Sequence, residues 1–198
     1  MDYKEITKQA YNEYHEKFDS YFQNSFDKYV EREAELFIKN LKGKKILDLG
    51  SGPGNQALYF KNKGFDILCI DNSEEMIKLC RQKGLKAEVM DIEYLNLSEK
   101  FGGIWANASL LHLKKESLPK IIARLKSLLN QEGIIYVAVK EGDKGGFEEN
   151  DKYPGMKRYF TYFRIKDIEG LFKDFKKIHH SREKINEKST FLRFIFKT

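Results

Sequence analysis

The sequence has little of what defines several protein classes. Its two cysteines, Cys69 and Cys80, are too few for a disulfide scaffold, and we interpret them as buried free thiols in a reducing, cytoplasmic setting. No run of about eighteen apolar residues occurs, so we expect no membrane-spanning segment. Residues 1–10 are charged and lack the apolar centre of a signal peptide. Secreted small scaffolds and membrane proteins are therefore disfavoured.

No internal repeat, low-complexity tract or Gly/Pro-rich linker divides the chain, so we expect one domain over residues 1–198. The 36 Lys and Arg residues exceed the 30 Asp and Glu residues, which gives a formal net charge of +6. Such an excess is compatible with an anionic partner such as RNA. The basic residues are nevertheless spread between acidic ones along the whole length, and no RNA-binding signature occurs. Solubility is the alternative explanation of the charge.

The chain does contain an alternation of strand and helix patterns. Apolar residues recur at helical spacing through residues 3–40, and Gly43 then stops the helical pattern. Five short apolar strands follow, separated by helices, at residues 44–50, 65–70, 86–90, 102–108 and 133–139. The helices between them are expected at residues 55–63, 73–84 and 115–130. This rhythm predicts an α/β protein with a mostly parallel sheet and helices on both faces.

The end of the chain breaks this rhythm. We expect a loop at residues 141–151, an extended segment at 158–163 and a short helix at 166–172. Residues 175–185 and 190–196 then read as two strands joined by a short turn. A terminal antiparallel hairpin argues against the dehydrogenase version of this sheet, which usually continues with helical crossovers.

A glycine-rich loop follows the first predicted strand and reads DLGSGPG over residues 48–54. Glycines allow a tight turn and a close approach of backbone to ligand, and the next helix presents free N–H groups at its start. The second strand is followed by Asp71, where an acidic side chain can accept hydrogen bonds from ribose hydroxyls. A dinucleotide site would need the pattern G-x-G-x-x-G, but Asn55 stands at the third glycine position. Asp48 would also repel a pyrophosphate, whereas it suits a cationic amino-acid group.

The segment ILDLGSGPGN (residues 46–55) resembles motif I of the class I S-adenosylmethionine-dependent methyltransferases, and the likeness continues in order over residues 40–140. The resemblance implies that Asp71 binds the ribose, that Asp91 takes the adenine amino group, and that Met90 or Ile92 flanks the ring. The full set of cofactor-binding residues that it implies is Asp48, Gly50, Ser51, Gly52, Gly54, Asp71, Asn72, Met76, Asp91, Ile92 and Asn107. Local alternatives stay open: Asp71 as a helix N-cap, Asp91 as a turn former, and Met76 as a core residue.

The resemblance also implies a fold, a Rossmann-like seven-stranded sheet in the order 3-2-1-4-5-7-6 with strand 7 antiparallel. We expect residues 1–40 to form an N-terminal helical lid, in which the helix over residues 3–18 orders when the cofactor binds. A permanently docked helix is the alternative. Residues 41–140 would form the cofactor-binding core, and residues 141–198 a substrate-side loop and terminal hairpin. Closure of such a lid would exclude water and hold the acceptor beside the methyl group.

Catalytic residues are harder to predict, because methyl transfer depends on positioning and needs a general base only when the acceptor is protonated. His112 and Tyr14 are weak candidates for such a base, and for His112 we favour a structural role. The acceptor pocket must come from outside the core, and its candidates are Tyr11, His15, Lys140, Arg158 and Tyr162.

Three other observations limit the chemistry. The D/N-P-P-Y/F tetrapeptide of nucleic-acid N-methyltransferases is absent, since residues 107–110 read NASL. Trp105 lies within a strand and is expected in the core. His179 and His180 should point to opposite faces of a strand, and we expect no metal site.

We therefore expect a methyltransferase that uses S-adenosyl-L-methionine, with a small-molecule acceptor. The alternatives are an RNA or protein methyltransferase that uses the basic surface, and a non-catalytic protein that binds the same cofactor.

Overall fold

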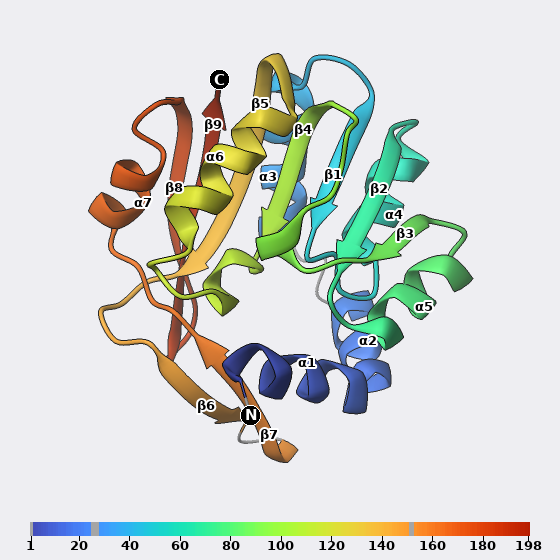
Figure 1. Ribbon diagram of the computed structural model, residues 1–198, viewed down its shortest axis with the longest axis vertical. Coiled ribbons are helices and arrows are strands. Elements are labelled where there is room, and N and C mark those ends of the chain that lie inside the picture. Colours follow the sequence, from blue (N-terminus) through green and yellow to red (C-terminus); the bar gives the residue numbers. More distant parts are fainter. Residues whose placement is uncertain (1, 25–27, 151–152) are drawn as a thin grey trace.

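A computed structural model describes residues 2–24, 28–150 and 153–198, and a seven-stranded sheet forms its centre (Figure 1). The strand order is β3-β2-β1-β4-β5-β9-β8. The bounds are β1 Lys45–Leu49, β2 Asp66–Asp71, β3 Lys86–Val89, β4 Phe101–Asn107, β5 Leu129–Lys140, β8 Lys176–Asn186 and β9 Ser189–Lys197. β9 runs antiparallel to β5 and β8, and the pairs from β3 to β5 are parallel. Counted along the chain within this sheet, the order is 3-2-1-4-5-7-6, as predicted.

Helices cover both faces because the inner strands bury side chains on both sides. Along β1, Ile46 joins one apolar cluster while Leu47 and Leu49 join the other, as the two-residue period of a strand requires. On the Ile46 side lie α3 Lys28–Asn40, α4 Asn55–Asn62 and α5 Glu74–Gln82. On the other side lie α6 Leu118–Leu128 and α7 Ile165–Leu171. Figure 1 shows α6 and α3 on opposite sides of the sheet.

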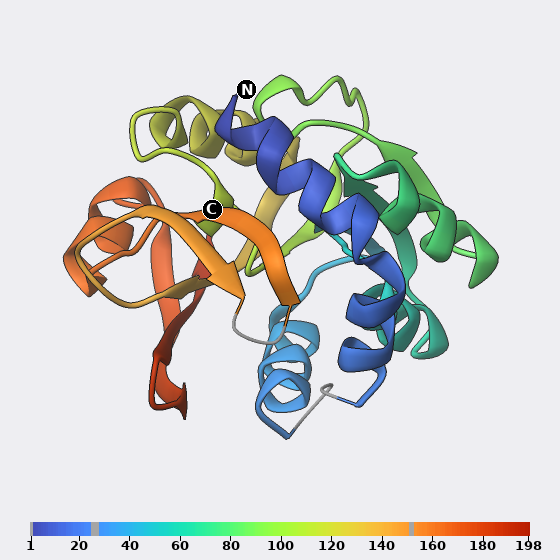
Figure 2. The same cartoon turned by 90° about the horizontal axis from the view of Figure 1, so that it is seen from below.

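Two further helices precede the sheet and lie at one end of it. α1 covers Tyr3–Glu13 and α2 covers His15–Asn24, with the break at Tyr14. In Figure 1 the arrowheads of β1 and β4 point down toward α1, and Figure 2 shows α1 crossing that end of the molecule. The helical prediction for residues 3–40 is thus correct in type, although residues 25–27 lie outside the described part. α1 sits at the carboxyl ends of the parallel strands, where ligands bind in open α/β sheets.

One local prediction is wrong. Within the segment predicted as a loop at residues 141–151, β6 (Gly146–Asn150) pairs antiparallel with β7 (Tyr153–Phe160) in a separate two-stranded sheet. The sequence signal is weak because β6 carries only one large apolar side chain, that of Phe147, and half of it is exposed. A strand without a buried face has no alternating pattern to detect. β7 also starts earlier than the extended segment predicted at 158–163.

Within the described ranges, no helix is long and apolar enough to cross a membrane.

Candidate active site

The glycine-rich loop joins β1 to α4 and has two kinds of glycine. A Cβ atom on Gly50 would lie 2.5 Å from Cβ of Ser109, so this glycine is required by packing within the protein. A Cβ atom on Gly52 would meet nothing within 4 Å, although its φ of +54° is in the left-handed region. The backbone at Gly52 therefore faces open space, and a ligand can approach it closely there.

Asp48 is buried at the end of β1 beneath this loop. The residue is 2% exposed, and its Oδ2 has no hydrogen-bond partner among the described residues. Burial raises the pKa of Asp48 well above its usual value. A buried carboxyl oxygen without a partner is costly unless a ligand satisfies it. Its chemistry suits the cationic amino group of an amino-acid ligand.

Asp71 ends β2 and holds the glycine-rich loop. Its Oδ2 accepts the Gly52 N–H at 2.9 Å, and its Oδ1 accepts the Ser73 N–H at 2.9 Å. Burial raises the pKa of Asp71, and these backbone hydrogen bonds oppose that rise. Ser73, not Asp71, caps α5, because the Ser73 hydroxyl accepts the Met76 N–H. The N-cap alternative for Asp71 is therefore wrong.

A cleft of about 390 Å³ lies between α1 and the ends of β2 and β3. Asn72, Met90 and Asp91 line one side of this cleft. Asp91 also caps the 3-10 turn Ile92–Tyr94 by accepting the Glu93 N–H, so its turn-forming role is real. Ile92 is partly buried against the sheet core.

Met76 and Asn107 occupy other parts of the strand ends. Met76 is 1% exposed and packs with Ala10, Phe18 and Met156, so it belongs to the apolar contact between α1, α2 and β7. Asn107 ends β4, and its Oδ1 accepts the Tyr136 hydroxyl at 3.5 Å.

His112 ends the 3-10 turn Leu110–His112 that follows β4 and joins three elements. Its Nδ1 lies 2.7 Å from the carbonyl oxygen of Tyr159, and its Nε2 lies 2.8 Å from the Tyr11 hydroxyl. A carbonyl only accepts, so Nδ1 carries the proton and Nε2 accepts from Tyr11. Burial lowers the pKa of His112 to about 3. The ring is therefore neutral at physiological pH.

Four of the five acceptor-side candidates, all except His15, form one cluster beside His112. Nη1 of Arg158 donates to the Tyr11 hydroxyl at 3.1 Å. Nζ of Lys140 lies 2.9 Å from Oε2 of Glu148, and the Tyr162 hydroxyl donates to Oε1 of the same carboxylate. These predicted residues are thus neighbours in space, although they come from three separate segments. The segments are the N-terminal helix, the end of β5, and β7 together with the residues that follow it.

Two candidates lie outside this cluster. The Tyr14 hydroxyl donates to the carbonyl oxygen of Pro154 at 3.3 Å, at the start of β7. Nδ1 of His15, at the start of α2, lies 2.7 Å from the carbonyl oxygen of Asn12 near the end of α1. Neither side chain contacts His112 or Arg158 through any hydrogen bond of the described residues.

The predictions that Trp105 lies in the core and that His179 and His180 point to opposite faces are correct. Trp105 is fully buried and stacks on Tyr136, and its Nε1 donates to Gln56. His179 bonds Glu33 on one face of the sheet, while His180 stacks on Phe194 on the other. Across the described ranges, no group of three His, Cys, Asp or Glu side chains is arranged to hold a metal ion.

A polar face of α1 was missed by the sequence reasoning. Nζ of Lys4 lies 2.8 Å from Asp91 and 2.7 Å from Glu93, and Asn12 accepts the Ser73 hydroxyl at 2.6 Å. Burial would lower the pKa of Lys4, but its bonds to the two carboxylates raise it overall. The signal was available, since Lys4, Lys8 and Asn12 are four residues apart and share one face of a helix.

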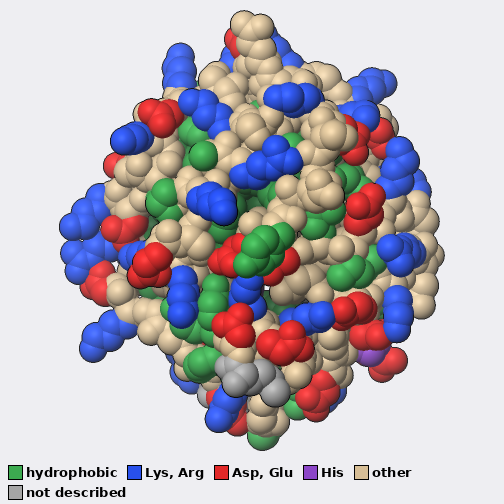
Figure 3. Space-filling view, in the orientation of Figure 1, with side chains coloured by type: hydrophobic (Ala, Val, Ile, Leu, Met, Phe, Trp, Pro, Cys, Tyr) green, Lys and Arg blue, Asp and Glu red, His purple; other side chains and the backbone are tan. Residues whose placement is uncertain are grey.

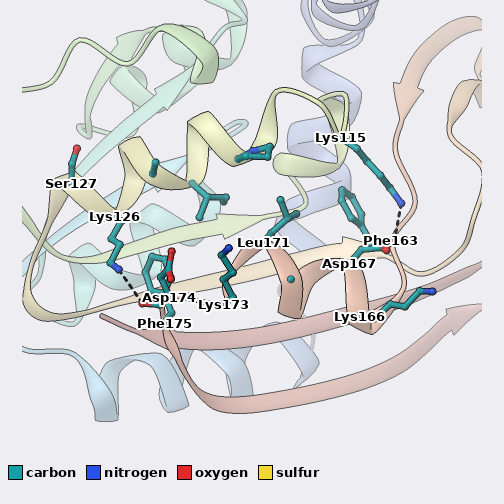
Figure 4. Close-up of a pocket in the computed structure, with 14 residues that line it drawn as sticks. Lys115, Lys126, Ser127, Phe163, Lys166, Asp167, Leu171, Lys173, Asp174 and Phe175 are labelled. Carbon is teal, nitrogen blue, oxygen red and sulfur yellow. Dashed lines mark hydrogen bonds and ion pairs between the residues drawn. The ribbon is translucent and has the colours of Figure 1, made fainter.

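A second hollow, a groove of about 780 Å³, lies between α6 and α7 (Figure 4). Lysines line it, but Lys115 is paired with Asp167 at 2.8 Å and Lys126 bonds the carbonyl oxygen of Asp174. No predicted site residue borders this groove. The predicted residues therefore gather at the strand ends and not in this hollow.

Comparison with known proteins finds methyltransferases. A family model described as a methyltransferase domain matches residues 46–133. An uncharacterized methyltransferase of Alkaliphilus oremlandii is 25% identical over 134 residues, which are 67% of this chain and 58% of the relative. A glycine/sarcosine N-methyltransferase of Aphanothece halophytica is 28% identical over 137 residues, which are 61% of this chain and 52% of the relative. The chain thus spans little more than half the length of these relatives.

Solved structures share the fold over nearly the whole chain. The 1,6-didemethyltoxoflavin-N1-methyltransferase of Burkholderia thailandensis has a TM-score of 0.77 at 18% identity and covers 99% of this chain and 88% of its own. An S-adenosylmethionine-dependent methyltransferase of Clostridium acetobutylicum has a TM-score of 0.73 at 18% identity. The match covers 94% of this chain and 98% of the other chain. The family match, the sheet order and the ordered motifs at the strand ends together support a class I S-adenosylmethionine-dependent methyltransferase.

Proposed function

We propose that the protein transfers the methyl group of S-adenosylmethionine to a small-molecule acceptor. The observation that carries this proposal is the cluster of Tyr11, His112 and Arg158, which α1 and β7 cover at the carboxyl ends of the strands. A site covered by a helix and a hairpin suits a small acceptor better than a macromolecule. Two relatives, by their names, act on glycine or sarcosine and on 1,6-didemethyltoxoflavin.

The cofactor would lie along the ends of β1, β2 and β4. The partnerless oxygen of Asp48 suits its amino group, and the open backbone at Gly52 leaves room for its approach. Asp71 would accept the ribose hydroxyls, because each carboxylate oxygen has a second lone-pair direction beyond its backbone bond. The cleft with Asn72 and Asp91 would take the adenine. When bound, the cofactor supplies an activated methyl group on a sulfonium.

The residues around the acceptor would act by positioning. Holding two reactants in line is worth up to about 7–11 kcal/mol in favourable cases. Neutral His112 would fix the Tyr11 hydroxyl, since its Nδ1 is already bound to the backbone. We propose the same division of the chain as before: a lid over residues 1–40, a cofactor-binding core over 41–140, and a substrate side over 141–198.

The macromolecular alternative rests on the net charge of +6. Figure 3 shows Lys and Arg side chains scattered among Asp and Glu on the face in view, with no continuous basic surface there. We therefore rank RNA or protein acceptors second, and a binding protein without catalysis third. The two free, buried thiols support our proposal of a reducing, cytoplasmic location.

A methyl-transfer screen tests the proposal. The protein is incubated with methyl-labelled cofactor and, separately, with a metabolite extract, bulk tRNA and a protein extract. Label in a small-molecule product is expected. Label in tRNA or protein alone would favour the second candidate, and tight cofactor binding without any transfer would favour the third.

Cofactor binding is tested by calorimetry with S-adenosylhomocysteine and with NAD. We expect low-micromolar binding of the first, about −8 kcal/mol, and none of the second. Asp71→Ala should weaken binding by about 1.5–3 kcal/mol, the range for a hydrogen bond to a charged group. Asp66→Ala is the matched control, because Asp66 begins the same strand and forms an exposed ion pair with Lys86. Binding of NAD alone would refute the cofactor assignment.

A further inference from the structure

Arg158 carries a charge that the protein itself does not neutralise. The guanidinium lies over three rings, with Cζ 5.5 Å, 5.2 Å and 5.0 Å from the centroids of Tyr11, Phe18 and Phe160. Its Nη1 donates to the Tyr11 hydroxyl. No described carboxylate forms an ion pair with it. Aromatic rings attract a cation, but they do not neutralise its charge as an anionic partner would.

One edge of this guanidinium is unused. Its Nε is buried and has no hydrogen-bond partner among the described residues. Nη2 makes no hydrogen bond within that same part of the chain, so the Nε–Nη2 edge offers two parallel N–H groups. This edge has the geometry that binds both oxygens of a carboxylate.

The neighbouring acid cannot supply that carboxylate. Both oxygens of Glu148 are engaged, Oε2 by Lys140 and Oε1 by Tyr162. Nζ of Lys140 lies 3.7 Å from the Phe160 ring centroid, so Lys140 and Arg158 lie over the same aromatic ring. Burial lowers the pKa of Lys140, and the charge of Arg158 adds to that effect. The cluster therefore has one positive charge in excess of its acids.

We propose that the acceptor carries a carboxylate and that the Nε–Nη2 edge of Arg158 binds it. This inference rests on the proposed methyl transfer to a small molecule and narrows its substrate class. Tyr11 on α1 and Phe18 on α2 cover the guanidinium, so the acceptor reaches Arg158 when these helices move and is enclosed when they return. Arg158 is then a specificity residue that positions the acceptor, while the transferred group comes from the cofactor.

A metabolite extract separated by anion exchange provides the test. Each fraction is assayed with methyl-labelled cofactor before and after its carboxylates are converted to amides with a carbodiimide and ammonia. The acceptor should elute with the anions and lose its activity on amidation. Alkaline phosphatase should leave that activity unchanged, and a loss after phosphatase would point to a phosphate and overturn the proposal. Activity that survives amidation would also overturn it.

Variants separate the acceptor from the cofactor. Arg158→Gln should raise KM for the active fraction at least about tenfold while the Kd for S-adenosylhomocysteine stays unchanged. Arg158→Lys keeps the positive charge but lacks the two parallel N–H donors. It should therefore reverse only part of the increase in KM. Lys157→Gln, which removes an exposed charge from the adjacent position of β7, should match the parent.

Two outcomes refute the proposal in different ways. If Arg158→Gln weakens S-adenosylhomocysteine binding by the same factor, the edge binds the carboxylate of the cofactor and not that of the acceptor. If the parent methylates no fraction although it binds S-adenosylhomocysteine, the proposed function fails, and the carboxylate assignment fails with it.

Discussion

Gly52 differs from the other residues of its loop because its side-chain position is open. Gly52→Val should weaken cofactor binding by at least as much as Asp71→Ala, since the new side chain would occupy the approach to the backbone. Gly64→Val is the matched control: Gly64 also has a positive φ, +86°, and open space at Cβ, but lies at the far end of α4. Both variants should lose about 1–2 kcal/mol of stability from backbone strain. Calorimetry that shows equal binding in the two variants would place the site elsewhere.

His112 gives a pH-dependent prediction at the same scale. Its pKa is about 3 in the folded protein and 6.5 in the unfolded chain, so between these values the unfolded state binds more protons. Its stabilising contribution is complete above pH 6.5 and is lost as the pH falls toward 3, by up to about 1.4 kcal/mol per pH unit.

Urea unfolding at pH 7 and pH 5 measures this loss. The parent should lose about 2 kcal/mol more than His112→Gln over that interval. Because the ring stays neutral, the methyl-transfer rate should show no step from His112 between pH 6 and 8. Equal pH dependence of stability in parent and variant would mean that His112 is protonated in the folded protein.

At the scale of elements, α1 is the most informative. It contacts α5 and the Asp91–Glu93 turn through polar groups and β7 through Thr7, whose hydroxyl accepts the Tyr159 N–H at 3.0 Å. Few apolar side chains hold it, since only Thr7 and Ala10 within it are buried. Elements with few buried apolar contacts open at low free-energy cost. We predict that α1 is a lid that becomes protected when the cofactor binds.

Hydrogen exchange of residues 3–18, with and without S-adenosylhomocysteine, decides between a lid and a permanently docked helix. Protection gained with the cofactor supports the lid. Lys4→Gln should speed exchange in α1 by breaking its contacts with Asp91 and Glu93, whereas Lys39→Gln, on exposed α3 surface, should not. Strong protection in both states would show a structural helix.

At the scale of the whole molecule, the positive charge raises the question of nucleic acid. We expect tRNA retention to be weak and to disappear as salt rises from 50 to 200 mM, as nonspecific phosphate contacts do. Filter binding over that range measures the effect, with methyl-transfer activity followed in parallel. Retention that persists at 200 mM, together with label in tRNA, would favour an RNA acceptor over a small molecule.

Much of the architecture could be predicted from short stretches of the sequence. Strand periods, helix caps and the DLGSGPG loop depend on neighbours within a few residues, so the sheet order and the positions of Asp48, Asp71 and Asp91 at strand ends followed from pattern and family likeness. β6 was missed because its pairing with β7 buries almost nothing, and a strand without a core face leaves no alternation in the sequence.

The sequence by itself determined the fold class and the glycine-rich loop after the first strand, because turn chemistry and hydrophobic periodicity are local properties. The strand order followed from the likeness to a known family. Only the tertiary structure decided which distant side chains meet. Tyr11 reaches His112 across 101 positions and Arg158 reaches Tyr11 across 147. Only the tertiary structure shows that the Nε–Nη2 edge of the Arg158 guanidinium is unused. The partner of a polar group depends on packing between elements and not on the residues beside it in the chain.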